Sequence, residues 1–312
     1  GSLIGGPVRK SPLGIIDRVL GAIVNVAVAG LVLSVVAGVV AALGVPFLAQ
    51  PIASSVVLRV LDAATPAPVD SAIAQLRGSV LASGIPQLGG SLGGAPSDPK
   101  VPGVDASTPA LERAARSVVK VTGTAYACGQ DQSGTGFVVA TDRVLTNAHV
   151  LAGVRAPVVL RQDGTPLVGK VTYFDPTADL AVVAVRGLGR PALPVDGEPS
   201  VGTTGVIDGF PFGGPFSSSG ASVLQVGLTE VPDVADSGTS ARHIATLAAN
   251  VQQGDSGGPL LSKAGHVLGI VFAKSSTTAD LGYAMTPAQF GSVAHRSPSL
   301  SRPVSSGACT RG

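Results

Sequence analysis

The order of apolar and polar residues changes twice along the 312-residue chain, and each change marks a region of different structure. Residues 19–58 contain no charged side chain, and residues 19–45 are almost wholly apolar. As an α-helix, residues 19–45 would be about 40 Å long, more than the ~30 Å hydrocarbon core of a bilayer. The pattern therefore predicts a transmembrane helix over 19–45. A secretory signal peptide is the alternative, but its apolar core would be shorter and a cleavage site would follow.

The charges around this span predict its orientation. Basic residues precede it, so residues 1–18 are expected to form a cytoplasmic juxtamembrane segment, with everything after residue 46 on the far side. The basic residues are Arg9, Lys10 and Arg18.

Residues 46–106 begin with short amphipathic patterns and end in a stretch without periodicity. Val69, Ile73, Leu76 and Val80 are spaced to share one face of a helix. Residues 84–109 contain 6 Gly and 5 Pro and show no apolar period. As a flexible coil this stretch would reach on the order of 30 Å. We therefore expect residues 46–106 to be short helices followed by a flexible linker.

From residue 107 to residue 312 the pattern becomes short apolar runs broken by Gly, Pro, Asn and Asp. Strands of this length and spacing predict an all-β sandwich or a pair of barrels, and roughly 200 residues fit two six-stranded barrels. The runs are Val118–Thr124, Gly136–Ala140, Val158–Arg161, Leu167–Tyr173, Leu180–Val185 and Val267–Phe272.

Composition excludes one class of function. The chain has 21 basic and 19 acidic side chains, a net charge of +2 and no run of Lys and Arg, which argues against a nucleic-acid-binding protein. His243, His266 and His295 share no metal-ligand spacing with Cys or acidic residues. We therefore expect neither a metal nor an organic cofactor, and we interpret His266 as a solvated residue of a turn between two strands.

Three local motifs suggest catalytic chemistry. The first is Gly134–Val139 followed by Leu145–Val150, the second is Ala178–Val183, and the third is Gly254–Leu260. A serine hydroxyl becomes a nucleophile when an imidazole takes its proton, and a carboxylate holds that imidazole in the correct tautomer. His149, Asp179 and Ser256 can fill these roles.

The glycines around Ser256 allow a sharp backbone turn. In such a turn the N–H groups of Gly254 and Ser256 would converge and stabilise a developing oxyanion.

The loop from Gly209 to Gly220 lacks the Gly-Lys-Ser/Thr ending of a phosphate loop, and we interpret it as a mobile surface loop near the substrate cleft.

Residues 110–295 resemble the trypsin-like serine proteases of the bacterial Deg type. The match lies in residues 146–150, 179–182 and 254–260, and residues 282–287 resemble the last strand of that family. The resemblance implies a chymotrypsin-like double β-barrel and hydrolysis of peptide bonds through an acyl-enzyme. It also implies a specificity pocket near Asn250, Val251, Phe272 and Ala273. Since Asn250 is not acidic, we expect a small or medium apolar residue before the cleaved bond.

The layout resembles the membrane-anchored periplasmic proteases of actinobacteria, which are linked to acid resistance in mycobacteria and carry a colicin V production-type membrane domain. Residues 12–65 would be the end of that domain. The resemblance implies a membrane-tethered enzyme in the periplasm or cell-wall space that acts in acid or envelope stress. Its expected partners are cell-envelope proteins, among them peptidoglycan hydrolases, together with its own linker by autocleavage.

The chain has two cysteines, Cys128 and Cys309. In an oxidising compartment such a pair is most simply a disulfide, which would pin the C-terminal tail to the first barrel.

Two functions other than an active protease stay open at this stage. One is a protease-like sensing module with its triad in an inactive geometry, and the other is a regulatory appendage of a membrane transport or assembly protein.

Overall fold

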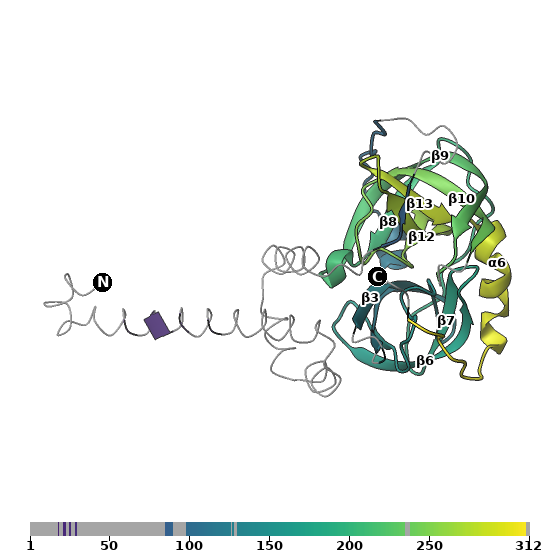
Figure 1. Ribbon diagram of the computed structural model, residues 1–312. Helices are drawn as coiled ribbons and strands as arrows, with labels where there is room; N and C mark the ends of the chain where they lie inside the picture. The colour runs from purple at the N-terminus through teal and green to yellow at the C-terminus, as the bar shows by residue number, and fades with distance from the viewer. Residues whose placement is uncertain are drawn as a thin grey trace, which may run out of the picture.

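A computed structural model describes residues 85–89, 98–125, 127, 130–234 and 238–309, together with helical residues 18, 21, 22, 25 and 29 (Figure 1). The rest of the predicted span over 19–45, the helical pattern over 69–80 and Cys128 lie outside the described residues. Within the part of the chain that is described, no helix is both long enough and apolar enough to cross a bilayer.

The short helix α5 (Pro109–Ala115) directly precedes the strands of the first barrel. Thr108 has an extended backbone and its Oγ1 accepts a hydrogen bond from the Leu111 N–H at 3.4 Å, while Pro109 occupies the first helical turn. A capping threonine followed by proline is a typical helix start. Leu111 and Ala114 are buried, so the helix closes one side of the apolar core.

Six strands form a closed barrel in the order β2-β3-β4-β7-β6-β5 (Figure 1). Its interior is filled mainly by β-branched and small apolar side chains, which suit a pleated surface. The strands are β2 (Val118–Ala125), β3 (Gln130–Ala140), β4 (Arg143–Thr146), β5 (Val158–Leu160), β6 (Pro166–Asp175) and β7 (Leu180–Val185).

A second group of strands pairs in the order β12-β11-β8-β9-β10-β13, and an additional β12–β13 pairing joins the two ends into a ring. Figure 1 shows this ring stacked on the first barrel. The strands are β8 (Thr204–Gly209), β9 (Ser217–Pro232), β10 (Thr239–Ala249), β11 (Pro259–Ser262), β12 (Val267–Ser275) and β13 (Leu281–Met285). The domain is therefore an all-β, chymotrypsin-like fold.

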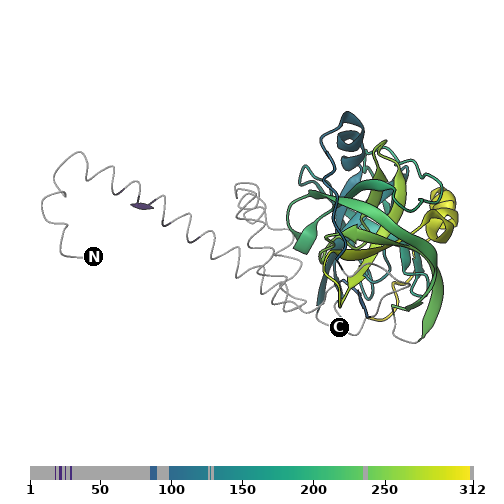
Figure 2. The ribbon, with the colours of Figure 1, turned by 90° about the horizontal axis from the view of Figure 1, so that it is seen from above.

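The C-terminal segment ties the two strand groups together. Helix α6 (Pro287–Arg296) lies along one flank of the domain (Figures 1 and 2) and is followed by the short turn η3 (Ser297–Ser299). The Arg143 guanidinium of the first barrel donates to the carbonyls of Ser297 and Leu300 at 3.1 and 2.9 Å. The chain then returns to the first barrel, where the buried Ser306 hydroxyl donates to the Val154 carbonyl at 2.6 Å.

Parts of the stretch expected to be linker lie against the domain. Strand β1 (Gln87–Leu88) pairs in parallel with β12, and Ile85 and Leu88 are buried. Further along, a methyl group on Gly220 of β9 would lie 2.0 Å from the Pro102 carbonyl oxygen, so residues near 102 run directly over that strand.

All six runs that were expected to be strands are strands, but the loop expected from Gly209 to Gly220 is shorter. It contains a 3-10 turn, η2 (Pro211–Gly213), and strand β9 starts at Ser217. The serines of this segment pair with β8, and the Ser218 hydroxyl donates to the buried Asp208 carboxylate. The sequence did not indicate this strand because serines are typical of loops. Here the polar side chain of Ser218 has a hydrogen-bond partner inside the fold.

Candidate active site

His149 and Asp179 form a tightly held pair in the first barrel. Both oxygens of the Asp179 carboxylate lie near His149 Nδ1, at 2.9 and 3.1 Å, and Oδ1 also accepts the His149 backbone N–H at 2.9 Å. Asp179 is 1% exposed. With Nδ1 facing a carboxylate, the neutral imidazole keeps its proton on Nδ1 and leaves Nε2 as the basic nitrogen.

The turn that follows β4 and the turn that precedes β7 position this pair. His149 follows β4, and Asp179 immediately precedes β7 with a left-handed backbone (φ +53°). β4 and β7 are adjacent in the barrel, with Thr146 opposite Ala181. The Asn147 side-chain amide donates to the Asp179 carbonyl at 3.0 Å and fixes the distance between the two turns.

Ser256 comes from the second group of strands, on a loop that is pressed against the first barrel. Its carbonyl accepts the Thr135 N–H at 2.8 Å, and the Thr135 hydroxyl donates to the Gly254 carbonyl at 2.6 Å. The next residue, Gly257, has φ +83°, and a methyl group there would lie 2.1 Å from the Thr135 carbonyl oxygen and 3.2 Å from Asn147 N. Ser256 is thus held beside the segment that carries His149.

Ser256 Oγ and His149 Nε2 are both buried, and neither has a hydrogen-bond partner among the described residues. Six other buried side-chain atoms of the described residues also lack a partner, so the position of these two on adjoining segments is what makes them candidates for a functional use. In enzymes without substrate, hydrogen bonds between catalytic groups are often long or poorly aligned and tighten when substrate binds.

The two expected oxyanion donors are also available. The Gln253 carbonyl accepts the Phe212 N–H at 2.5 Å, and because a trans peptide points its N–H opposite to its C=O, the Gly254 N–H faces away from Phe212. Neither the Gly254 nor the Ser256 N–H donates to another group in the described part of the chain. Gly254 has φ +95°, and a methyl group there would lie 2.3 Å from the Phe210 carbonyl oxygen, so the loop requires glycine.

A carboxyl group lies buried under this loop. Asp255 is 5% exposed, and its Oδ2 accepts the Gln252 N–H at 2.8 Å. Burial raises the pKa of Asp255 to about 7. The neighbouring strand β8 carries Asp208, whose pKa burial raises to about 6 against the opposing effect of its hydrogen bond from Ser218. The loop around Ser256 and the neighbouring strand β8 thus each contain a buried, poorly solvated carboxyl group.

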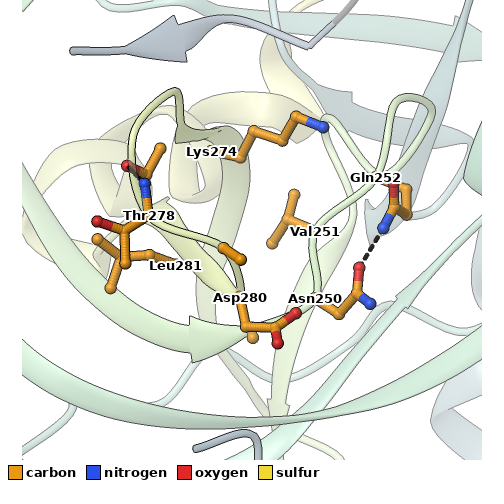
Figure 3. A pocket seen from close by; sticks show the side chains of 10 residues that line it. Asn250, Val251, Gln252, Lys274, Thr278, Asp280 and Leu281 are labelled. Carbon is orange, nitrogen blue, oxygen red and sulfur yellow. Dashed lines mark hydrogen bonds between the residues drawn. The ribbon is translucent and has the colours of Figure 1, made fainter. Parts of the chain in front are cut away.

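A cavity of about 240 Å³ opens beside this loop (Figure 3). Asn250 and Val251, two of the expected pocket residues, line it, whereas Phe272 and Ala273 are core residues that do not. In place of Phe272 and Ala273, the cavity is lined by Lys274 and Ser275 of β12 and by the loop over residues 278–280, which the sequence did not indicate. The full lining is Ala249, Asn250, Val251, Gln252, Lys274, Ser275, Thr278, Ala279, Asp280 and Leu281.

Arg242, which sequence reasoning missed, lies against the turn that carries Asp179. It is buried on β10, donates from Nε to the Thr177 carbonyl and from an Nη to the Pro232 carbonyl, both at 3.1 Å, and lies 5.9 Å from the centre of the Phe272 ring. Burial lowers the pKa of Arg242, while the carboxylates of Asp179, Asp233 and Asp175 raise it. In sequence it was one more basic residue, with no motif around it.

The remaining candidates lie away from this site. His266 Nδ1 lies 2.7 Å from Asp196 Oδ1 on a half-exposed surface, so it has a carboxylate partner rather than solvent alone. No group of three or more His, Cys, Asp or Glu residues that could hold a metal ion occurs among the residues described. Cys309 packs on the first barrel and is disulfide-bonded. Because Cys128 lies outside the described residues, its pairing with Cys309 remains a prediction.

Comparison with known proteins gives two family matches. The trypsin-like peptidase domain matches residues 134–270, and the colicin V production protein family matches residues 1–66. The chain is 33% identical to "Serine protease Rv3671c" of Mycobacterium tuberculosis (strain ATCC 25618 / H37Rv) over 321 residues, which cover 99% of this chain and 79% of that protein.

Solved structures agree with this relationship. The active form of the Rv3671c protease from M. tuberculosis superposes with a TM-score of 0.66 at 34% identity, covering 71% of this chain and 99% of that one. An inactive form of the same protease superposes with a TM-score of 0.56 at 34% identity, over 64% and 97% of the two chains. The chain therefore belongs to the Deg-like, trypsin-like serine proteases homologous to Rv3671c, with a colicin V production domain at its N-terminus.

Proposed function

We propose that this serine protease is a membrane-tethered endopeptidase of the cell envelope that works through His149, Asp179 and Ser256. Ser256 Oγ attacks the carbonyl carbon of the cleaved bond while His149 Nε2 takes the hydroxyl proton. The same proton passes to the leaving amine, and an acyl-enzyme on Ser256 remains. Water then attacks the acyl-enzyme with His149 again as the base, which releases the second product.

The surrounding groups have separate tasks in this reaction. The Asp179 carboxylate keeps the imidazole in the tautomer with Nδ1–H and stabilises the imidazolium that forms. The Gly254 and Ser256 N–H groups receive the oxyanion of the tetrahedral intermediate. In a serine protease of another fold, one such donor contributes about 3 kcal/mol to the stability of the transition state. The chain's own groups supply every step, with no metal or organic cofactor proposed.

The observation that carries this proposal is the double contact of Asp179 with His149. One carboxylate bonds both the ring Nδ1 and the backbone N–H of the same histidine, at 2.9 Å each. Asp179 thus holds both the ring and the backbone of His149, with Nε2 on the side of the ring away from the carboxylate. The free Ser256 hydroxyl and the two free N–H groups lie on the loop that packs on this segment.

A fluorophosphonate probe tests the proposal, because it reacts with an activated serine and not with an ordinary one. We expect the wild-type chain to be labelled on Ser256 and Ser256→Ala to be unlabelled. Ser217→Ala, which removes an exposed hydroxyl of β9, serves as the matched control and should label normally. A wild-type chain that is never labelled, with or without peptide substrate present, would favour a protease-like sensing module instead.

The specificity pocket remains a separate part of the proposal. We infer that the cavity beside Asn250 and Val251 takes the side chain that precedes the cleaved bond, with a small or medium apolar residue preferred. The Val251 side chain is directed into the cavity, whereas Asp280 and Asn250 lie together at one end of it (Figure 3). Cleavage-site profiling with a peptide library measures this preference directly, and dominant cleavage after Arg or Lys would contradict it.

Membrane association is supported by the colicin V production match over residues 1–66 and by the relationship to Rv3671c over almost the whole chain. We propose a span over residues 19–45 that places the protease domain in the periplasm or cell-wall space. Substrates would be cell-envelope proteins, peptidoglycan hydrolases among them, and the enzyme's own linker, in a role in acid or envelope stress. Proteomics of a Ser256→Ala strain against wild type would identify them, and an unchanged phenotype in that strain would favour a regulatory appendage.

A further inference from the structure

One edge of strand β12 leads from Ser256 to a segment of the N-terminal region. Beside the proposed nucleophile, Val271 makes two hydrogen bonds with the Ser256 loop. Its N–H donates to the Gly258 carbonyl at 2.9 Å, and its carbonyl accepts the Gly257 N–H at 2.8 Å. Farther along β12, the Lys274 N–H donates to the Pro86 carbonyl and the Ser276 N–H to the Leu88 carbonyl, both at 3.1 Å. Strand β13 covers the opposite edge of β12.

This edge is where an extended substrate would lie. A residue in the cavity contacts Val251 and Lys274, and its carbonyl must reach Ser256. The preceding residues therefore run back along β12 from Val271 towards Lys274, adding a strand through main-chain hydrogen bonds. At ~3.4 Å per residue, the partner of Lys274 would be about three residues before the cleaved bond.

Strand β1 runs in the opposite direction to such a substrate. β12 moves away from Ser256 as its numbers rise, so a substrate whose C-terminal side points at Ser256 is antiparallel to β12. β1 is parallel to β12, with Gln87 opposite Lys274 and Leu88 opposite Ser275. The chain of β1 therefore runs away from Ser256, and β1 occupies the edge without presenting a peptide bond to the nucleophile.

Buried apolar side chains anchor β1 at this edge. Leu88 belongs to the apolar cluster that contains Phe272 and Ala273, and Ile85 to the cluster that contains Val251, a residue of the cavity wall. Gln87, between them, is exposed. The Ser276 hydroxyl also donates to the Leu88 carbonyl, at 3.3 Å.

We propose that the β12 edge at Lys274–Ser276 is a binding surface for which residues 85–89 and an extended peptide substrate compete. The N-terminal segment then acts as an uncleaved internal competitor, and its release lets long substrates bind. This inference rests on the proposed function, because it assumes that peptides are cleaved at Ser256. It predicts that competition depends on substrate length, since a substrate too short to reach Lys274 does not meet β1.

Two substrates and the full chain in detergent test the competition. Leu88→Asp places a charge where a buried leucine packs and should detach β1. We expect it to lower KM about tenfold for a peptide with four residues before the cleaved bond, the effect of one or two backbone hydrogen bonds. A single-residue ester should keep its kcat/KM within about twofold, because it does not extend to Lys274.

Two further variants make the result decisive. Gln87→Ala changes an exposed side chain of β1 and should leave both substrates unaffected. Replacing residues 85–89 by a Gly-Ser sequence of equal length releases the edge even if Leu88→Asp does not, and should act like Leu88→Asp. Equal loss of activity on both substrates would show that β1 only supports the cavity wall, and no change on either would show that it does not compete. Both results overturn this inference while fluorophosphonate labelling of Ser256 continues to support the proposed function.

Discussion

Asp255 precedes the proposed nucleophile, is almost wholly buried, and has a pKa that burial raises from 3.8 to about 7. The Gln252 N–H and the charge of Lys274 oppose this shift only in part. Asp255→Asn keeps an oxygen that can accept the Gln252 N–H but cannot ionise. We therefore expect this substitution to change the stability of the domain in a way that depends on pH.

The size and sign follow from the shift. A shift of about three pKa units makes ionisation of Asp255 cost ~4 kcal/mol more in the folded chain than in the unfolded one. Because the folded pKa is raised, the folded chain binds the extra proton between about pH 4 and pH 7. The free energy of unfolding therefore falls as the pH rises through that window and is unaffected below it. Asp208, raised to about 6, adds ~3 kcal/mol in the same direction.

Thermal unfolding of residues 85–312 measures this effect, with Ser256→Ala as the background to prevent self-digestion. At pH 7.5 we expect Asp255→Asn to unfold about 10 °C above the parent, since ~1 kcal/mol shifts the Tm by 2–4 °C in a domain of this size. At pH 4 the two should unfold within about 2 °C of each other. The exposed position Asp98→Asn is the matched control and should follow the parent at both pH values.

The reasoning would be refuted by a Tm difference between Asp255→Asn and the parent that stays the same at pH 4 and pH 7.5. Such a result would mean that the amide alters packing and that the Asp255 carboxyl does not titrate between these values. A parent that is more stable at pH 7.5 than at pH 4 would contradict the combined effect of Asp255 and Asp208.

Substitutions at three other positions probe the site and its supports. Arg242→Met leaves the Thr177 and Pro232 carbonyls without their buried donor, so we expect kcat on a small ester to fall at least about tenfold with KM nearly unchanged, and Arg242→Lys to recover part of it. Gly254→Ala forces a methyl group against the Phe210 carbonyl and should lower kcat on the same ester about a hundredfold or more, because one oxyanion donor is displaced. Cys309→Ser should destabilise the domain by up to ~5 kcal/mol in denaturant titration if Cys309 closes the long loop to Cys128, and free thiols on both cysteines in the native protein would contradict that pairing.

The proposed catalytic residues could be picked out from the sequence because each lies in a short motif. The turn after β4, the turn before β7 and the glycine-rich loop around Ser256 each need particular residues within a few positions of one another. The strand over 267–272 and the first-barrel strands were also predictable, because alternating or continuous apolar runs between turn residues are local patterns. The resemblance to trypsin-like proteases then followed from the order of these motifs.

What only the tertiary structure decided depends on contacts between residues far apart in the chain. Strand β1 contains too few residues to show a pattern of its own, and it forms because β12 offers an edge 187 residues away at the Gln87–Lys274 pair. Arg242 lies near Asp179 only through the packing of β10, and Asp280 lines the cavity only because its loop folds beside Asn250 and Val251. The buried state of Asp255 is likewise a property of the packed loop, because a carboxyl group's pKa is set by the solvent it loses on folding. Local sequence thus determined the proposed reacting groups, and long-range packing determined which residues hold them in place and which segment lies on the proposed substrate-binding edge.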